Sequence, residues 1–293
     1  MLQGISETFS KSGLTIDSSV RFMDMKRIKR SDEYFRKLQE MLESGYRNIK
    51  FDATLACDND ALNFIRIYRD KLFPDVPVVF SSINDFDRQM LDGRSDITGT
   101  SENTDYLGTI NVAIKLLPAT KTIVVVTDNT TTGQAHRSAI EKLRDTVPKN
   151  LAIKFLSLGE MTIEELGTVL SKLNEESVVL LVQHFVDKNG ISHSLPASTP
   201  FITSRSAAPV FVLTDSRMGF GALGGHVVSG YHHGAAASEM VIEILKGKSI
   251  SSIPVLLDSP NKYLFDYPVM KRFRISEKSL PPESIIINRP DTV

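Results

Sequence analysis

The chain has little cysteine, no excess of either charge and no long apolar run, and each shortage excludes a class of protein. Its single cysteine, Cys57, cannot form an internal disulfide, and its place at the end of an apolar run predicts a buried thiol. Lys and Arg number 34 against 35 Asp and Glu, so the formal charge of −1 provides no basic field for nucleic acid or anionic lipid. No segment reaches the ~18 apolar residues of a membrane span. We therefore expect a folded protein without a nucleic-acid partner.

Motifs of common enzyme classes are absent or incomplete. The chain has neither G-x-S-x-G nor H-E-x-x-H, which are common signals of serine hydrolases and zinc proteases. Residues 219–224 read G-F-G-A-L-G, with Glu239 at about the distance of a ribose-binding acid, but they lead into an apolar run and not into a helix. Residues 247–249 read G-K-S, yet Ile242 occupies the place of the earlier P-loop glycine. We predict that the chain is not an enzyme, and a cytosolic NAD-dependent enzyme stays as a minor alternative.

Three of the six histidines, His226, His232 and His233, lie close together in the sequence and raise the question of a metal site. Adjacent side chains on a helix point about 100° apart, and no cysteine or acidic residue completes a familiar ligand spacing. We expect these histidines in a polar cleft or a hinge, and we predict neither a metal nor a cofactor.

From Ser31 onward, amphipathic segments alternate with short apolar runs, which is typical of repeated βα units around a parallel sheet. The helix at 32–43 is the clearest, because its apolar residues recur at helical spacing between a capping serine and Gly45. The pattern predicts further helices at 59–72, 105–116, 133–145, 163–173 and 231–246. It predicts strands at 51–57, 77–81, 97–99, 122–127, 152–157, 178–182 and 210–214, followed by an irregular tail.

Pro118 divides these elements into two series. The second series begins with the run from Thr122 to Thr127, whose β-branched residues are typical of a strand buried on both faces. One continuous sheet of about ten strands would be unusually wide. We therefore predict two α/β lobes, with the cleft between them as the natural ligand site.

Polar clusters follow the predicted strands at their carboxyl ends, where open α/β sheets bind ligands. The candidate ligand-binding residues are Asn59, Asp60, Ser81, Asn84, Asp128, Asn129, Thr132, His184 and Asp215. For each residue taken singly, helix capping explains the residue type as well as ligand contact does. Helix N-terminal amides would hold a ligand carboxylate, while Asp128 or Asp215 would hold an ammonium group. This pattern favours an amino-acid-like solute.

Short motifs in both halves of the chain carry a resemblance to a known family. The first half contains D-N-D-A-L at 58–62, L-F-P at 72–74, P-V-V-F at 77–80, I-T-G at 97–99 and V-V-V-T-D-N at 124–129. The second half contains G-A-L-G-G at 221–225, G-Y at 230–231 and I-L-K-G-K at 244–248. Together they resemble the ABC transporter substrate-binding protein family over nearly the whole chain. D-N-D-A-L and the ending at 280–290 are most similar to periplasmic sensor regions of bacterial signalling proteins.

The resemblance implies a type I periplasmic-binding-protein fold, in which three crossovers near Pro118, Ser229 and Pro254 join two Rossmann-like lobes with parallel sheets. Lobe one would comprise residues 1–117 and 230–252, and lobe two residues 118–229 and 253–293 with the C-terminal tail. By position, the residues facing the cleft would be Asn59, Ser81, Asp128, Asn129, His184 and Asp215. The family begins with an apolar strand, whereas residues 1–5 are similar to the interior of the following helix. The first strand of lobe one is therefore expected to be missing, which would leave unpaired sheet edges.

The resemblance also implies a small-molecule ligand on which the lobes close, and a membrane permease or a membrane-bound signalling module as partner. It implies a periplasmic or other extracytoplasmic location, although residues 1–20 show no signal peptide or anchor. The effector-binding domain of a transcriptional regulator shares this fold and is the main alternative. No basic helix-turn-helix precedes the first lobe to support it.

Overall fold

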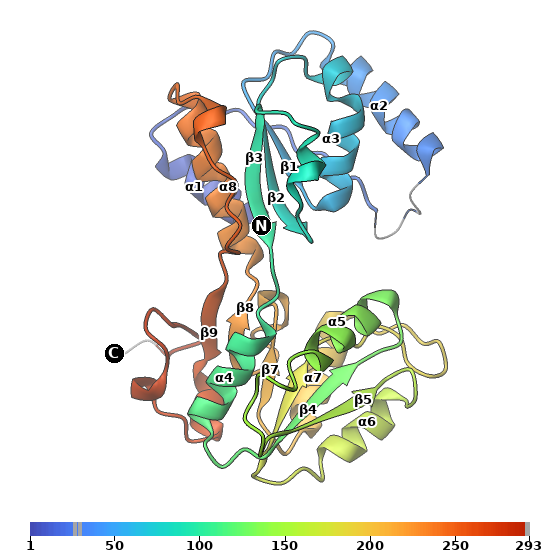
Figure 1. Cartoon of the computed structure of the whole chain (residues 1–293), viewed down its shortest axis with the longest axis vertical. Helices are drawn as coiled ribbons and strands as arrows, with labels where there is room; N and C mark the ends of the chain where they lie inside the picture. Colours follow the sequence, from blue (N-terminus) through green and yellow to red (C-terminus); the bar gives the residue numbers. More distant parts are fainter. Residues whose placement is uncertain (26–27, 29–30, 291–293) are drawn as a thin grey trace. The chain divides into compact units, whose positions relative to one another are not determined.

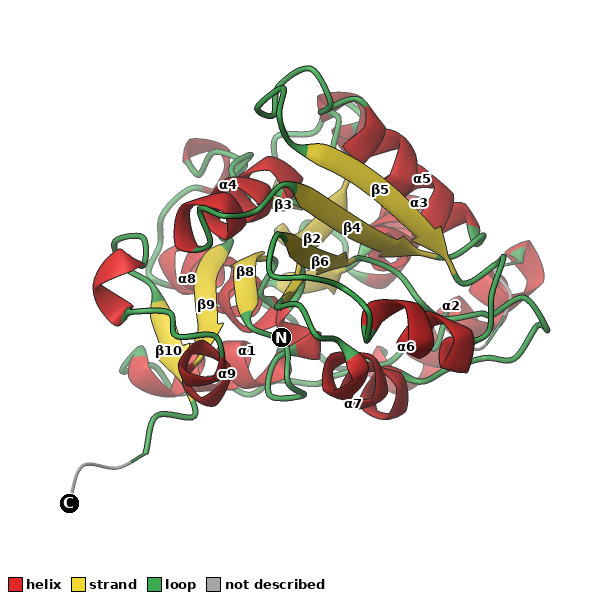
Figure 2. Cartoon of the chain, turned by 90° about the horizontal axis from the view of Figure 1, so that it is seen from below, coloured by secondary structure: helices red, strands yellow, loops and turns green. Residues whose placement is uncertain are grey.

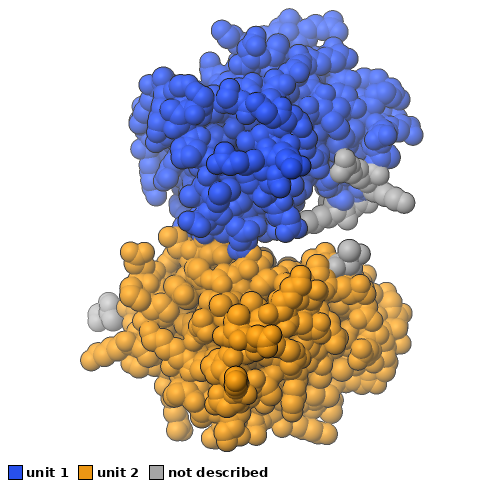
Figure 3. Space-filling view, viewed as in Figure 1, with its two compact units in different colours: residues 1–103, 230–260 blue, residues 104–229, 261–293 orange. Residues whose placement is uncertain are grey.

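The computed structural model describes residues 1–25, 28 and 31–290, and the chain forms two units with separate sheets. Unit 1 comprises residues 1–103 and 230–260, and unit 2 comprises residues 104–229 and 261–293 (Figure 3). The chain therefore passes between the units at three places, and each unit combines segments that are distant in the sequence.

Unit 1 is built on a parallel sheet in which β1 (Thr54–Cys57), β2 (Val78–Asn84) and β3 (Ile97–Glu102) lie in that order. Its helices are α1 (Leu2–Lys11), α2 (Asp32–Tyr46), α3 (Asn59–Leu72), η1 (Arg88–Leu91), α8 (Gly230–Leu245) and η3 (Ile250–Ser252). Helices α2 and α3 cover one face of the sheet, and α1 and α8 cover the other (Figure 1). Alternation along β2 explains both layers, because Phe80 packs in the core with α2 and α3 whereas Val79 packs against α8.

Helices α1 and α8 pack closely because a glycine lies on each side of their contact. A Cβ atom on Gly4 would lie 2.1 Å from the carbonyl oxygen of Tyr231, and one on Gly234 would lie 2.4 Å from the carbonyl oxygen of Met1. The hydroxyl of Tyr231 also donates to Glu7 Oε2 over 2.7 Å. The first helix is thereby fixed to the part of unit 1 that follows residue 229.

Unit 2 is built on a larger sheet with the strand order β10-β9-β8-β7-β6-β4-β5. The strands are β4 (Thr122–Thr127), β5 (Ala152–Ser157), β6 (Ser177–Leu181), β7 (Val210–Val212), β8 (Gly224–Val227), β9 (Lys262–Asp266) and β10 (Ile285–Ile287). All neighbours in this sheet are parallel except β8 and β9. Figure 2 shows β5, β4 and β6 side by side, between two layers of helices.

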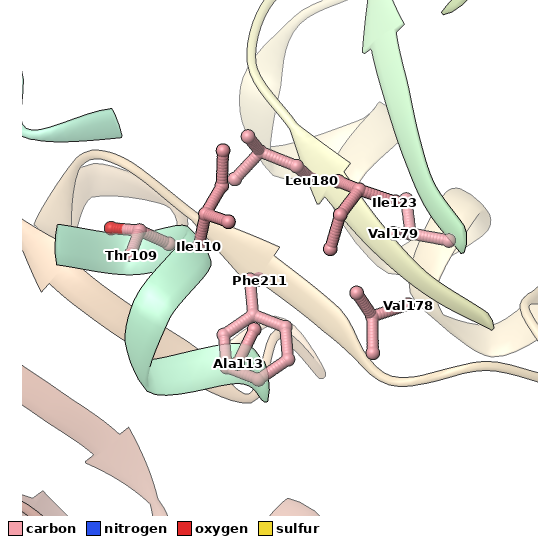
Figure 4. A pocket seen from close by; sticks show the side chains of 8 residues that line it. All are labelled: Thr109, Ile110, Ala113, Ile123, Val178, Val179, Leu180 and Phe211. Carbon is pink, nitrogen blue, oxygen red and sulfur yellow. The ribbon is translucent and has the colours of Figure 1, made fainter. Parts of the chain in front are cut away.

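The helices of unit 2 are α4 (Tyr106–Leu116), α5 (Thr131–Glu141), α6 (Ile163–Leu170), α7 (Leu195–Arg205), η2 (Asp215–Arg217), α9 (Tyr267–Arg272) and η4 (Glu277–Ser279). The side chains of α4, α5 and α9 share one core with the sheet, and those of α6 and α7 share the other. Figure 4 shows Ile110 and Ala113 of α4 gathered with Leu180 and Phe211 of the sheet. The space among these side chains has no room for a water molecule, as expected for a close-packed interior.

The sequence pattern predicted several elements with their observed bounds, and it missed others. Helix α3 and strands β4 and β5 begin and end at the predicted residues. The expectation of an irregular tail is wrong, because β9, α9 and β10 lie in it. Helix α7 was also missed, since it contains two prolines. Pro196 is in the first turn, where its missing amide costs no hydrogen bond, but Pro200 lies inside the helix.

The observed units differ from the predicted lobes at two of the three junctions. Residues 104–117 belong to unit 2, because α4 packs on β7 and β8. Residues 253–260 belong to unit 1, where Thr98 Oγ1 donates to the Ile253 carbonyl (2.8 Å) and the Ser101 amide donates to the Leu256 carbonyl (2.9 Å). The third junction follows residue 229.

Strands β1 and β2 are direct neighbours, with Thr54 opposite Val78 and Cys57 opposite Ser81. Residues 2–11 form α1, in agreement with the similarity of residues 1–5 to the interior of the family's first helix. Over the part of the chain that the structure describes, no helix combines the length and the apolar composition needed to cross a bilayer.

Candidate functional site

The predicted residues lie at the carboxyl ends of parallel strands in both units. We call the residues that follow β1, β2 and β3 the carboxyl edge of unit 1. The carboxyl edge of unit 2 consists of the residues that follow β4, β6 and β7, together with the first turns of α4 and α5. Open α/β sheets bind their ligands at such edges, so each of the two edges is a candidate functional site in its own unit.

In unit 1, the side chain of Asn59 joins the ends of β1 and β2. Its Nδ2 donates to the Asn84 carbonyl over 3.0 Å, and its Oδ1 accepts from the Asn84 amide over 2.9 Å. Asp58, with a φ of 80°, caps α3 by accepting from the Asn59 amide over 2.7 Å. The side chain of Asn59 thus braces the edge, while Asn84 is exposed and Asp60 is half-buried in the first turn of α3.

Strand β2 is irregular at Ser81 and Ser82, where its register with β3 shifts. Ser82 has a φ of 57°, and its buried hydroxyl has no hydrogen-bond partner among the described residues. Ser81 Oγ donates to the His233 carbonyl over 3.3 Å. The His233 ring lies between Thr100 Oγ1 (3.3 Å) and Ser259 Oγ (3.1 Å), and burial lowers its pKa to about 4. This ring is therefore neutral near pH ~7.

In unit 2, Asp128 follows β4 and is 2% exposed. Its Oδ1 accepts from the amide and the hydroxyl of Thr130, and its Oδ2 accepts from the Phe185 amide over 2.7 Å. Both carboxylate oxygens are thereby engaged within the unit. This geometry favours a role in holding the loop after β6, and it leaves little capacity for an ammonium group.

His184 and Arg217 form a buried pair at the ends of β6 and β7. Arg217 Nη1 donates to His184 Nδ1 over 2.8 Å, and Nη2 donates to the Val182 carbonyl over 3.1 Å. Nε2 of His184 lies 2.7 Å from Ser198 Oγ, whose hydroxyl donates to the Ser194 carbonyl. These partners assign the proton of a neutral imidazole to Nε2. Burial and the neighbouring Arg217 charge lower the pKa of His184 to about 3.

Three aromatic side chains complete the carboxyl edge of unit 2. The Tyr106 hydroxyl is hydrogen-bonded to His136 Nδ1, and the two rings meet edge to face at 5.7 Å. Phe185 is 36% exposed, and its ring centroid lies 6.0 Å from the Arg217 guanidinium carbon. Burial, followed by the charge of Arg217, lowers the pKa of His136. The edge thus combines aromatic surface with a buried cation.

The remaining predicted residues of unit 2 are accessible. Asn129 is exposed and accepts a hydrogen bond from Ser157 Oγ over 2.9 Å. Thr132 is exposed in the first turn of α5. Asp215 is half-buried, with Oδ2 accepting from Ser229 Oγ over 2.8 Å. These three side chains offer polar groups to a solute at this edge.

Sequence reasoning missed Tyr106, His136, Phe185 and Arg217. Two of them also follow predicted strands and could have been found by their position, since Phe185 directly follows His184 and Arg217 comes two residues after Asp215. Phe185 was not predicted because it is apolar, whereas the prediction was based on clusters of polar residues. The pair of Tyr106 and His136 has no local signal, because the two residues belong to different helices.

The other chemical candidates from the sequence find structural explanations. The stretch 219–224 leads into β8 and not into a helix, as predicted. Gly224 has a φ of 134°, and a Cβ atom there would lie 1.9 Å from the Leu264 carbonyl oxygen, so this glycine serves strand packing. Within the described ranges, no group of His, Cys, Asp or Glu side chains is arranged to hold a metal ion.

Sequence comparisons find relatives of one kind. A family model described as ABC transporter substrate binding protein matches residues 70–278. A protein of Clostridioides difficile (strain R20291), described as tyrosine-binding protein, is 22% identical over 210 residues. This match covers 70% of the chain but 59% of the relative, so the chain spans less than two-thirds of that protein's length.

Solved structures show the same similarity. The ligand-free, open structure of a substrate-binding protein with adhesive properties from Clostridium difficile has a TM-score of 0.66 at 15% identity, covering 98% of this chain and 93% of that one. The ABC domain in complex with L-Trp from Streptococcus pneumonia has a TM-score of 0.59 at 16% identity, covering 97% and 93%. At these identities the structural likeness establishes the fold alone.

Proposed function

The chain belongs to the ABC transporter substrate-binding protein family, and from this premise we propose that it binds a small, amino-acid-like solute at the carboxyl edges of its units. The observation that carries the proposal is the carboxyl edge of unit 2, where polar, aromatic and cationic side chains from several elements meet. Within unit 1, the exposed Asn84 and the half-buried Asp60 are proposed to offer polar groups to a solute at the carboxyl edge of that unit.

The family assignment bears on the alternatives that the sequence left open. This family and the structural neighbours are substrate-binding proteins and not enzymes, which confirms the prediction that the chain is not an enzyme. The neighbours also confirm the predicted α/β, type I periplasmic-binding-protein fold. The match favours a solute-binding protein over the effector domain of a transcriptional regulator.

An amino-acid-like solute is supported by the chemistry of unit 2. Asp215 would hold an ammonium group, and the first turn of α5, beside Thr132, offers backbone amides to an acidic group. Phe185, Tyr106 and His136 provide ring surface for an apolar side chain. One relative is described as tyrosine-binding and one similar structure holds L-Trp, which adds support for an amino acid.

Family membership also implies a transporter permease as partner and a site of action outside the cytoplasm. We propose that the chain works in the periplasm or another extracytoplasmic space. Its partner in the membrane is proposed to be a permease or, by its resemblance to sensor regions, a membrane-bound signalling module.

A thermal-shift screen followed by calorimetric titration tests the proposal. The panel holds L-amino acids, nucleobases, small carboxylates and sugars, and a solute at ~100 times its Kd should stabilise the chain by about 2.7 kcal/mol. We expect an amino acid to give the largest shift. A panel without any saturable binding by the well-folded chain would contradict the proposal.

A pair of matched variants locates the site. Asp215→Asn removes a charge at the carboxyl edge of unit 2 and should weaken binding of the selected solute about tenfold or more. Asp145→Asn removes a charge from an exposed turn between α5 and β5, at the opposite edge of the same sheet, and should leave the Kd unchanged. Equal effects of the two substitutions would place the solute elsewhere.

A further inference from the structure

Arg217 is a buried cation that no carboxylate neutralises at close range. The residue is 3% exposed, at the end of η2. Its guanidinium is hydrogen-bonded to the His184 ring and the Val182 carbonyl. Among the residues that the structure describes, no Asp or Glu side chain forms an ion pair with it. Burial lowers the pKa of Arg217 to about 10, which leaves the guanidinium charged near pH ~7.

The groups nearest to Arg217 leave it without an anion in direct contact. His184 stays neutral, because its pKa is lowered to about 3 and Ser198 occupies its second nitrogen. The charge of Asp128 raises the pKa of Arg217, but the carboxylate oxygens are hydrogen-bonded to Thr130 and Phe185 and form no ion pair with the guanidinium. A buried charge without a close partner is costly to the fold. A negatively charged solute bound near Arg217 would offset this cost.

The charge of Arg217 acts on accessible residues of the carboxyl edge of unit 2. After burial, its charge is the next cause that lowers the pKa of the half-buried His136, and its guanidinium carbon lies 6.0 Å from the ring centroid of the partly exposed Phe185. At an effective dielectric constant of ~20, a unit negative charge ~6–8 Å away gains an attraction equivalent to roughly 30- to 100-fold in affinity. A solute therefore need not touch the guanidinium to be selected by it.

We propose that Arg217 makes the carboxyl edge of unit 2 selective for solutes that carry a negative group, foremost a carboxylate. His184 acts as a positioning residue, since its neutral Nδ1 accepts from the guanidinium without cancelling the charge. The inference rests on the proposed solute-binding function and names the chemical class of the solute. It assigns to the edge a residue that the polar clusters of the sequence did not include.

Calorimetric titration with acid and amide pairs tests this selectivity. The probes are L-tyrosine with L-tyrosinamide, L-tryptophan with L-tryptophanamide and L-leucine with L-leucinamide, which differ in the carboxylate charge. The wild-type chain should prefer the acid of the bound pair on the order of 10- to 100-fold. In Arg217→Met the acid should lose that advantage while the amide binds about as before, and Arg217→Lys should restore part of the preference.

Arg144→Met serves as the control, because Arg144 also donates to a backbone carbonyl, that of Ile153, and lies over an aromatic ring, that of Phe155. It should leave the preference unchanged.

Equal binding of acid and amide by the wild-type chain overturns the inference while the solute-binding function stands, as does selective binding of an uncharged solute. Should Arg217→Met fail to fold, Arg217→Lys still decides, because it should reduce the preference for the acid while the amide binds as before. Absence of any binding overturns the proposed function and this inference with it.

Discussion

Among the described residues, each unit has one deeply buried arginine, and the two have opposite surroundings. Arg69 in unit 1 is 1% exposed and donates to the Asp96 carboxylate and the Val76 carbonyl, each over 2.8 Å. Arg217 in unit 2 is paired with a neutral histidine and a carbonyl. Arg69 lies at the amino ends of its strands, where Asp96 directly precedes β3, whereas Arg217 lies at the carboxyl ends. An ion pair thus stabilises one edge, whereas a charge without an ion-pair partner lies at the edge proposed to bind solute.

The largest effect is expected from removing the carboxylate that neutralises Arg69. Asp96→Ala leaves a buried guanidinium with one carbonyl, and breaking a buried pair in this way costs roughly 3–5 kcal/mol. Asp96 itself is 38% exposed, so we expect the lower end, about 3 kcal/mol of the free energy of unfolding. Urea denaturation of both proteins measures the loss.

The matched control is Asp70→Ala, which removes a highly exposed partner of Arg94. Exposed ion pairs contribute little, so its cost should stay below about 0.5 kcal/mol. A cost of Asp96→Ala no larger than that of Asp70→Ala would break the comparison, because Arg69 would then tolerate an unpaired state as Arg217 does.

Acidification should affect both units through their buried histidines. Burial lowers the pKa of His233 in unit 1 to about 4 and that of His184 in unit 2 to about 3, with the Arg217 charge adding to the latter. Below the ordinary histidine pKa of ~6.5, the unfolded chain binds a proton that the folded chain does not bind. Stability is therefore fully present above pH ~6.5 and falls as the pH drops towards the folded values, by about 2 kcal/mol per histidine at pH ~5.

Unfolding free energies at pH ~7 and pH ~5 check this effect in the wild-type chain, His184→Asn and His233→Asn. Each variant should show a pH difference that is about 2 kcal/mol smaller than that of the wild type, whatever its absolute stability. Carboxyl groups titrate alike in all three proteins and cancel in the comparison. A difference that is unchanged in His184→Asn would mean that the Arg217 pair accepts a protonated imidazole.

Most of the fold was predictable because its signals are local. The capped amphipathic segment of α3 and the β-branched run of β4 contain everything that fixes their bounds. The pairing of β9 with β8 has no local signal, because α8 separates the two strands in the sequence. In this pair, His226 lies opposite Tyr263. The tail was therefore assigned as irregular.

The sequence predicted that the candidate residues lie at the carboxyl ends of strands, but it did not predict the contacts of each side chain. The sequence places Asp128 at the end of a strand, but it does not show that the Phe185 amide, 57 residues later, occupies the carboxylate. Arg217 is harder to predict from the sequence, because the argument for its role depends on the absence of a carboxylate in contact with it. Whether a buried charge is paired is a property of the folded chain, and residue type gives no indication of it.

The smallest effect is expected at the hydroxyl that holds His184. Ser198→Ala removes the acceptor of the Nε2 proton, and the loss of one buried hydrogen bond costs about 1 kcal/mol of the free energy of unfolding. Ser204→Ala removes an exposed hydroxyl from the same helix and should change stability by less than about 0.5 kcal/mol. If Ser198→Ala proved as costly as Asp96→Ala, the neutral histidine would stabilise Arg217 as firmly as a carboxylate stabilises Arg69. A cost near 1 kcal/mol, together with a reduced preference for acids over amides, would instead mean that the Ser198 hydroxyl helps to orient the guanidinium. Ser198 would act on Arg217 through the His184 ring, to which both residues are hydrogen-bonded.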